Sequence, residues 1–207
     1  MLPFFFVQNS IAFLKFDMLR DNDLVPITDR IKQVLLTCDF GYSICGFYTS
    51  DCNGYYVLHL KNGSNIKTIN DLLKNPSVIT SVVKAIVFVD VVELYDVCTL
   101  YVHRNKGYMK SLMAELIKTF SNKDIWLGVD YHHSDFEKIT NFYIGFGFGN
   151  PGNVMKTTQG TILKKSVLCL SYPTDQNPDQ IKVMIRTIKQ TASMDTNNQF
   201  IEHFMKF

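Results

Sequence analysis

The middle of the chain changes its hydrophobic pattern from that of a strand to that of a helix. Residues 93–99 are rich in β-branched and aromatic types, which predicts a buried strand. Apolar residues then recur at helical spacing, with Lys110, Glu115 and Lys118 off their stripe. The stripe consists of Met109, Leu112, Met113, Leu116, Ile117 and Phe120. The pattern therefore predicts a strand, a connecting loop and an amphipathic helix.

The loop between this strand and this helix is basic and holds Gly107 where the helix would begin. The N–H groups of a first helical turn have no partner within the helix, and the helix dipole favours negative charge there. A basic loop at such a point is typical of an anion site. We expect the anion to be a phosphate group.

Strands and helices alternate along the rest of the chain. Asn53-Gly54 predicts a hairpin turn between strands at 42–50 and 55–60. Residues 82–92 are strand-like and run into the 93–99 strand without a turn signal, which leaves either two paired strands or one long bent strand. Further strands are expected at 2–7, 125–130, 154–158 and 162–172. Helices are expected at 11–19, 29–36, 69–73, 135–143 and 180–189.

Composition and charge narrow the class of protein. With 46% hydrophobic and 19% charged residues, the chain is globular rather than disordered. A formal net charge of +2 gives no broad basic surface of the kind that nucleic-acid binders show, so we rank a nucleic-acid partner last. The mixed order of elements predicts an α+β fold, in which a mostly antiparallel central sheet is flanked by helices.

The five cysteines stand at positions 38, 45, 52, 98 and 169. An odd count without a Cys-x-x-Cys pair argues against a disulfide framework and against a zinc site, so no metal is expected. The apolar start of the chain lacks a basic n-region, and no run is long enough to span a bilayer. We therefore expect a cytoplasmic protein without a membrane partner.

Two motifs resemble those of the Gcn5-related N-acetyltransferase (GNAT) superfamily. Its acyl-CoA motif has Gln or Arg, two variable residues, Gly, one variable residue, then Gly or Ala; here it is Arg104-Asn105-Lys106-Gly107-Tyr108-Met109. Met109 departs from the small residue of the family. Downstream, residues 143–148 read Tyr-Ile-Gly-Phe-Gly-Phe and fit the family's Tyr-x-x-x-Gly-Phe signature. The two motifs stand in the expected order and at about the expected distance, within residues 93–148.

The resemblance implies acetyl-CoA as co-substrate and a GNAT-like domain over 1–173, followed by a helical extension over 174–207. Strands 93–99 and 125–130 would be parallel neighbours that splay apart and leave a wedge for the cofactor. The pyrophosphate would bind the backbone N–H groups of 104–110, which are those of Arg104, Asn105, Lys106, Gly107, Tyr108, Met109 and Lys110. The backbone of Val97, Cys98 and Thr99 would contact the pantetheine arm. The alternatives are a solvated basic turn and an ordinary core strand.

Glu93 is the candidate general base. Acyl transfer needs a neutral amine, so some group has to accept a proton from the acceptor. By resemblance, Glu93 falls where the histone acetyltransferase branch of the family has its glutamate base. The alternative is a glutamate at a strand end that faces water. Asp90, Asp96 and Asp130 compete for this role, as do two histidines of the loop after 125–130, His132 and His133.

Tyr143 is the candidate general acid for the departing thiolate, on the strength of the family match. The alternative for Tyr143 is an aromatic ring packed against Phe146 and Phe148. Asp135 or Asn141 would be further cofactor contacts, although the Asn that the family carries before its Tyr is not cleanly present.

The leading hypothesis is an acetyl-CoA-dependent N-acetyltransferase that moves the acetyl group directly to a primary amine. The acceptor is a protein lysine, an N-terminus or a small amine, and the sequence leaves this choice open. The alternative hypothesis is a catalytically silent CoA-binding or protein-interaction module.

Overall fold

A computed structural model describes residues 4–20, 22–38, 53–61, 64–130, 134–149 and 167–172, together with 177 and 179. The chain divides into two compact units, Met1–Lys123 and Asp124–Phe207. We describe each unit by itself. The strands predicted at 42–50 and 154–158, the helix predicted at 180–189 and the domain boundary predicted at 173 lie outside the described residues.

The first unit is built on an antiparallel meander of five strands. In chain order these are β1 (Phe5–Gln8), β2 (Ile11–Lys15), β3 (Gly54–Leu60), β4 (Ile79–Val87) and β5 (Val91–Thr99). Each strand pairs with the next, so the order in the sheet is the order in the chain. The predicted α+β class with a mostly antiparallel sheet is confirmed for this unit.

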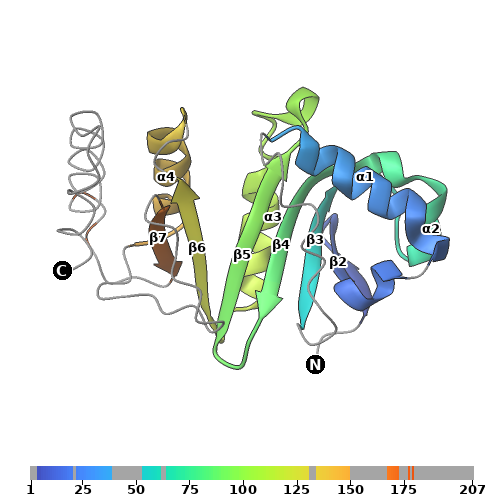
Figure 1. Ribbon diagram of the computed structural model, residues 1–207, viewed down its shortest axis with the longest axis horizontal. Helices are drawn as coiled ribbons and strands as arrows, with labels where there is room; N and C mark the ends of the chain where they lie inside the picture. The colour runs from blue at the N-terminus through green and yellow to red at the C-terminus, as the bar shows by residue number, and fades with distance from the viewer. Residues whose placement is uncertain are drawn as a thin grey trace. The chain divides into compact units, whose positions relative to one another are not determined.

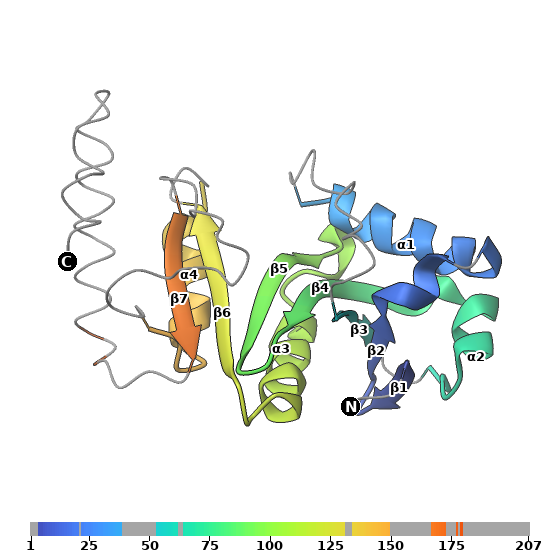
Figure 2. The same ribbon diagram turned by 60° about the horizontal axis from the view of Figure 1, so that its bottom comes forward.

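Helices cover both faces of this sheet. On one face lie α1 (Val25–Leu36) and α2 (Ile69–Lys74), and on the other lies α3 (Tyr108–Thr119). Figures 1 and 2 show α1 and α3 on opposite sides of β3, β4 and β5. Helix α1 buries Ile27, Ile31 and Val34 in one cluster with strand residues such as Leu58 and Val82. Alternate strand positions serve the two faces, so this sheet is a buried middle layer.

Residues 11–19 are not the predicted helix. They form strand β2 and a following 3₁₀ helix, Phe16–Arg20. The four residues Ile11 to Leu14 are all fully buried, because β2 has a covered face on each side. A continuous apolar run of this kind suits either a strand or a helix, and periodicity alone does not separate the two. Asn9 and Ser10, at φ 49° and 64°, make the two-residue turn that pairs β2 with β1.

The reversal between β4 and β5 exists although no residue there signals a turn. Two antiparallel strands are joined by residues 88–90, so the alternative of one long bent strand is wrong. The Phe88 N–H donates to the Val91 carbonyl at 2.8 Å, and the Lys123 ammonium donates to the carbonyls of Phe88 and Val89. A lysine distant in sequence therefore stabilises the turn.

Gly54 begins β3, and packing requires a glycine there. The predicted hairpin turn at Asn53-Gly54 would join a strand outside the described residues, so it stays a prediction. A Cβ at this position would lie 2.2 Å from the Phe16 ring, so only glycine lets that ring lie against the sheet. Phe16 in turn meets Tyr56 edge-on, at 5.0 Å between ring centroids. The glycine thus shapes the α1-facing side of the sheet.

The second unit contains β6 (Asp124–Asp130), α4 (Phe136–Ile144) and β7 (Val167–Tyr172). β6 and β7 pair antiparallel, with Leu127 opposite Leu170. The predicted strand at 125–130 and helix at 135–143 are confirmed to within a residue. The predicted splayed pair of parallel strands would join β5 of the first unit to β6 of the second, and it stays a prediction.

Candidate active site

The loop from β5 to α3 ends with an exposed helix start. After a 3₁₀ turn at Tyr101–His103, Asn105 and Gly107 adopt left-handed φ values of 61° and 78°. Helix α3 has no side-chain cap, and its first hydrogen bond runs from the Ser111 N–H to the Gly107 carbonyl at 3.0 Å. The N–H groups of the first turn, residues 108–110, therefore precede the helical ladder. A Cβ atom placed on Gly107 would meet no other atom within 4 Å, so the space beside this turn is open.

The buried ring of His59 packs against the first residue of α3. His59 on β3 is only 2% exposed and stacks on Tyr108 with 4.5 Å between ring centroids. Its Nδ1 lies 2.8 Å from the Thr80 hydroxyl. Burial, and then the neighbouring His103, lowers the pKa of His59 from 6.5 to about 4, so the ring is neutral at pH 7. Burial also lowers the pKa of His103, with Lys106 adding to the effect.

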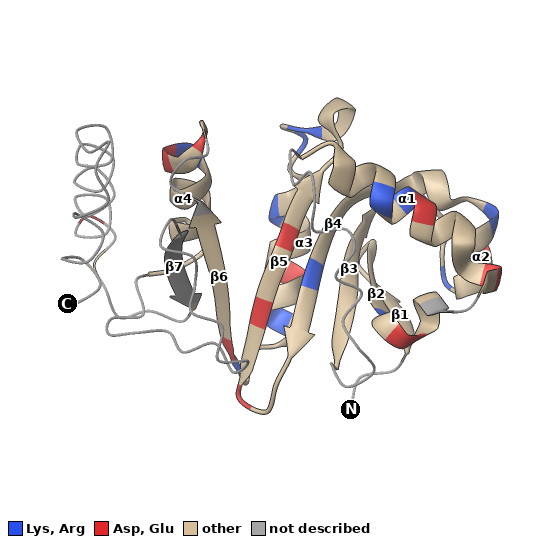
Figure 3. Cartoon of the chain, viewed as in Figure 1, with Lys and Arg blue, Asp and Glu red and all other residues tan. Residues whose placement is uncertain are grey.

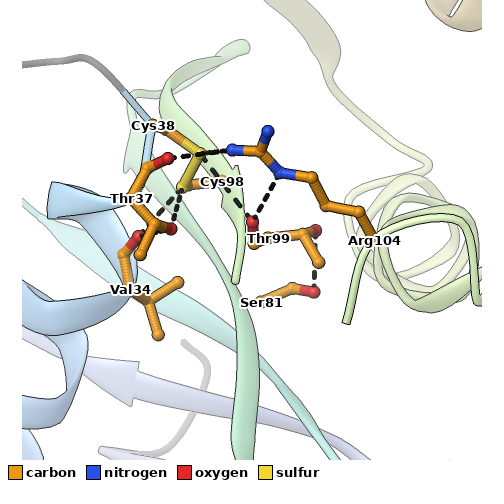
Figure 4. Close-up of a disulfide and its surroundings, with 7 residues drawn as sticks. All are labelled: Val34, Thr37, Cys38, Ser81, Cys98, Thr99 and Arg104. Atoms are coloured by element: carbon orange, nitrogen blue, oxygen red, sulfur yellow. Dashed lines mark hydrogen bonds between the residues drawn. A yellow bond between two sulfur atoms is a disulfide. The ribbon is translucent and has the colours of Figure 1, made fainter. Parts of the chain in front are cut away.

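Arg104 binds the protein rather than the open side of the loop. Its guanidinium donates to the carbonyls of Thr37 at 2.9 Å and Thr99 at 3.2 Å, and it also reaches the Cys38 sulfur (Figure 4). It therefore ties the end of α1 to the end of β5. Arg104, Lys106 and Lys110 are all exposed, but the Arg104 guanidinium is held by these contacts with α1 and β5.

Cys38 and Cys98 form a disulfide, with their Cα atoms 6.0 Å apart (Figure 4). The expectation drawn from the cysteine count is wrong at this pair. The two residues are 60 positions apart in sequence, and only the packing of α1 against β5 brings them together. Disulfides are rare in the cytosol, so the cytoplasmic location stays a prediction.

Strand β5 carries a bulge in the middle of the predicted cofactor segment. Its register with β4 shifts between the pairs Lys84–Tyr95 and Val82–Cys98, and Asp96 has a φ of 51° at this point. A bulge interrupts the ladder and re-aims the residues beside it. Val97 and Thr99 are half-buried, whereas the Cys98 side chain is turned into the core. The predicted contact of this stretch with a pantetheine arm is a backbone contact, and it stays a prediction.

Polar groups collect on the α1-facing side of the sheet beside this bulge. Figure 3 shows acidic positions on β5 next to a basic position on β4. Glu93 is 3% exposed, and its Oε2 accepts a 2.7 Å hydrogen bond from the Tyr95 hydroxyl. The buried Lys84 ammonium lies 3.9 Å from the Asp96 carboxylate. Glu93 is therefore not the water-facing glutamate of the alternative interpretation.

The other acid–base candidates lie elsewhere. Asp90 is exposed in the β4–β5 reversal, and His132 and His133 fall outside the described residues, as does the side chain of Asp130. Tyr143 belongs to α4 of the second unit, where its ring meets Phe142 and Phe148 edge-on. Burial raises the pKa of the Tyr143 hydroxyl. Asp135 and Asn141 are exposed on or beside α4.

Neither a metal cluster nor a membrane span is found in the part of the chain that the structure describes. No group of three or more His, Cys, Asp or Glu side chains could hold an ion there. No described helix is long and apolar enough to cross a bilayer.

Solved structures resemble this chain. The ribosomal-protein-S18-alanine N-acetyltransferase of Escherichia coli is 16% identical, and the match covers 82% of this chain and 96% of that one with a TM-score of 0.51. This chain has the GNAT fold. An acetyltransferase of the GNAT family from Staphylococcus aureus matches at 13% identity over 78% and 98% of the two chains, with a TM-score of 0.49. An aminoglycoside 6'-N-acetyltransferase complexed with coenzyme A matches at 13% over 76% and 96%, with a TM-score of 0.47.

No model of a protein family matches the chain, and no curated protein sequence does. The GNAT fold confirms the fold class that the two motifs implied. Within it, sequence reasoning missed Tyr95 and Lys84. One signal was present for Tyr95, because residues two apart on a strand share a face, and Tyr95 is two residues from Glu93.

Proposed function

We propose that this chain is an acetyl-CoA-dependent N-acetyltransferase that transfers the acetyl group directly to a primary amine. The observation that carries the proposal is the open start of α3 directly after β5, on a GNAT fold. Its first-turn N–H groups have no acceptor among the described residues, and exposed Lys106 and Lys110 flank it. Such a helix start binds phosphate groups through donors and dipole.

The rest of the site supplies the chemistry in three parts. Backbone groups of Val97 to Thr99 hold the pantetheine arm, and the bulge at Asp96 presents strand N–H groups to the thioester oxygen. Glu93 takes a proton from the acceptor amine, whose ordinary pKa of about 10.4 keeps it charged at pH 7. The amine nitrogen then attacks the thioester carbon and the C–S bond breaks.

Tyr143 is the proposed proton donor to the departing thiolate. A thiol has a pKa of about 8.5, and burial raises that of Tyr143 above the ordinary phenol value of 10.0. The transfer is therefore uphill, and we expect Tyr143→Phe to lower kcat by only about tenfold.

The test is release of free thiol from acetyl-CoA in the presence of primary amines: lysine peptides, peptides with free N-termini, and small amines. Glu93→Gln is nearly isosteric and cannot accept the proton, so we expect kcat to fall about a hundredfold while the Kd for CoA stays within twofold. A Glu93→Gln enzyme with the rate and pH profile of the wild type would remove Glu93 from this role.

A catalytically silent CoA-binding module is the second candidate, and Met109 favours it. This half-buried side chain stands at the second helical position, where the family motif has Gly or Ala. CoA binding by calorimetry without thiol release on any amine would select the module. No heat with CoA at millimolar concentration would overturn both candidates.

A further inference from the structure

Glu93 has one oxygen that is bonded and one that is not. Oε2 accepts from the Tyr95 hydroxyl at 2.7 Å, whereas Oε1 is buried and has no hydrogen-bond partner among the described residues. The side chain as a whole is 3% exposed. Buried carboxylate oxygens are nearly always bonded, because leaving one unpaired costs free energy. An unpaired buried oxygen at a site of acyl transfer is therefore a place for a ligand donor.

Local backbone geometry explains why Tyr95 reaches this carboxylate. Tyr95 and Glu93 are two residues apart on β5, so their side chains leave the same face. Glu93 pairs with Ile86 and Tyr95 with Lys84, which places both beside the α1-facing side of β4. The bulge begins directly after Tyr95, so the pair stands at the last regular position before the cofactor segment.

We propose that Tyr95 is a positioning residue, which holds Oε2 of Glu93 and thereby turns Oε1 toward the ammonium group of the acceptor. This inference rests on the proposed function. The acceptor binds as a protonated primary amine, and one of its N–H bonds points to Oε1. That proton passes to the carboxylate, the neutral nitrogen forms the C–N bond at the thioester carbon, and the C–S electrons leave with the thiolate. The nitrogen then loses a second proton to solvent, and the thiolate takes one from Tyr143, which solvent reprotonates. The products are the N-acetyl amine, free CoA thiol and one net proton, which Glu93 returns to solvent.

The charged groups around the pair belong to two strands. Lys84 of β4 and Asp96 of β5 face each other at 3.9 Å, and Tyr95 of β5 and Tyr56 of β3, which both pair with Lys84, lie on the same side. Helix α1 packs over neighbouring Cys98 with apolar residues and Thr37. Its Asp29 and Lys32 are exposed and pair with each other, and Arg30 binds the carbonyls of Ser77 and Ile79. Glu93 is thus the one described carboxylate here with an open, buried oxygen.

The experiment compares Tyr95→Phe with the wild type and with Tyr55→Phe. Tyr55 is a buried tyrosine of β3, which lies one position from Tyr56 and so on the opposite, α3-facing side of the sheet. For Tyr95→Phe we expect kcat to fall about tenfold, because the Glu93 carboxylate loses the bond that fixes its orientation. The KM for acetyl-CoA should change less than twofold in both variants.

A second readout does not require turnover. With glutamate labelled at its carboxyl carbon, the Glu93 NMR signal at pH 7, assigned with Glu93→Gln, should move in Tyr95→Phe, which lacks the hydrogen bond to Oε2, and not in Tyr55→Phe. Addition of n-butylamine at pH 7 should shift the Glu93 signal in the wild type. An unmoved Glu93 signal in Tyr95→Phe, or equal effects of the two variants, would overturn the inference. A wild-type protein whose Glu93 signal shifts with n-butylamine but which transfers no acetyl group would refute the proposed function instead.

Discussion

Helices α2 and α3 begin in opposite ways. The start of α2 is closed by a capping box, in which Asp71 accepts from the Thr68 N–H at 2.9 Å and the Asp71 N–H donates to the Thr68 hydroxyl at 3.2 Å. The start of α3 has Gly107 at the equivalent position, without any side-chain cap. The third helical residue is Asp71 in α2 and Lys110 in α3, so even the sign of the charge is reversed.

The difference lies in how each helix start is held. α2 satisfies first-turn donors with its own capping box. α3 has no side-chain cap, and its first residue, Tyr108, stacks on the His59 ring instead. An anion site requires backbone N–H groups that are fixed in position and have no acceptor within the protein.

The largest expected effect comes from filling the open turn at Gly107. Gly107→Val adds a branched side chain where backbone has to approach the phosphates, so CoA affinity should fall at least about a hundredfold, or about 2.7 kcal/mol. Calorimetry with CoA measures this. Gly107→Asn is the matched control, because Asn tolerates the φ of 78° better than Val does. Its effect on CoA affinity therefore reports mainly the obstruction by a side chain and not backbone strain. Wild-type affinity in Gly107→Asn would show that no close approach is needed.

The second effect is on the pH dependence of the free energy of unfolding, which should differ between the supports of the two helix starts. The folded-state pKa of His59 is about 4 against 6.5 when unfolded, so the unfolded state binds the extra proton first. The stability that the neutral ring contributes is complete above pH 6.5 and is lost as pH falls toward 4. We expect a loss of about 2 kcal/mol between pH 7 and pH 5 in urea titrations, and a flatter profile in His59→Gln.

Asp71 acts in a lower window. Hydrogen bonds from the backbone of Lys67 and Thr68 lower its pKa below 3.8, so the capping box weakens only below that value. Acid should therefore loosen the support of α3 before it opens the cap of α2. Amide exchange of the two helices at pH 5 is the direct check, and earlier exchange at the start of α2 would contradict this order.

A third change gives α3 the charge pattern of α2. Lys110→Glu places a carboxylate at the third helical position, where it competes with a bound phosphate and complements the dipole. CoA affinity should fall about tenfold, or about 1.4 kcal/mol, with thermal stability unchanged or slightly raised. Lys110→Gln removes the charge without reversing it and should have a smaller effect on CoA. Equal affinities in all three proteins would place the phosphates elsewhere.

The smallest change is the reverse experiment in α2. Thr68→Ala removes the capping hydroxyl and should lower the free energy of unfolding by about 1 kcal/mol. CoA affinity should stay the same, because α2 has no donors to offer. A marked loss of CoA binding would mean that the contrast between the two helix starts is not the reason for their different roles.

Local signals in the sequence were enough for some of these features. The 109–120 stripe, Gly107 and the basic loop predicted α3 and its open start, because each depends on residues close together in the chain. The prediction of a helix at Ile11 to Leu14 was wrong, because a strand that is covered on both faces lacks the alternation of polar and apolar residues. The contacts of Lys123 with the β4–β5 turn and the clamp made by Arg104 join distant residues, and nothing in their local sequence announces them.

The candidate site divides in the same way. Glu93 was found through its distance from Arg104 and the family it resembles. The bond from Tyr95 follows from strand alternation once the strand is accepted, although the bulge after it does not. Cys38 and Cys98 stayed hidden because their pairing depends on where α1 ends over β5.

The disulfide between Cys38 and Cys98 closes a covalent loop of the chain, and this loop contains β3, α2 and β4. The unfolded chain is therefore free of this loop in samples reduced with dithiothreitol, whereas the loop restricts its conformations in samples kept in air. On chain-entropy grounds the oxidised form gains about 4 kcal/mol over the reduced one. A colorimetric sulfhydryl count on a reduced sample would also register the thiols of Cys38 and Cys98, so a blank with protein and no acyl donor belongs in each run.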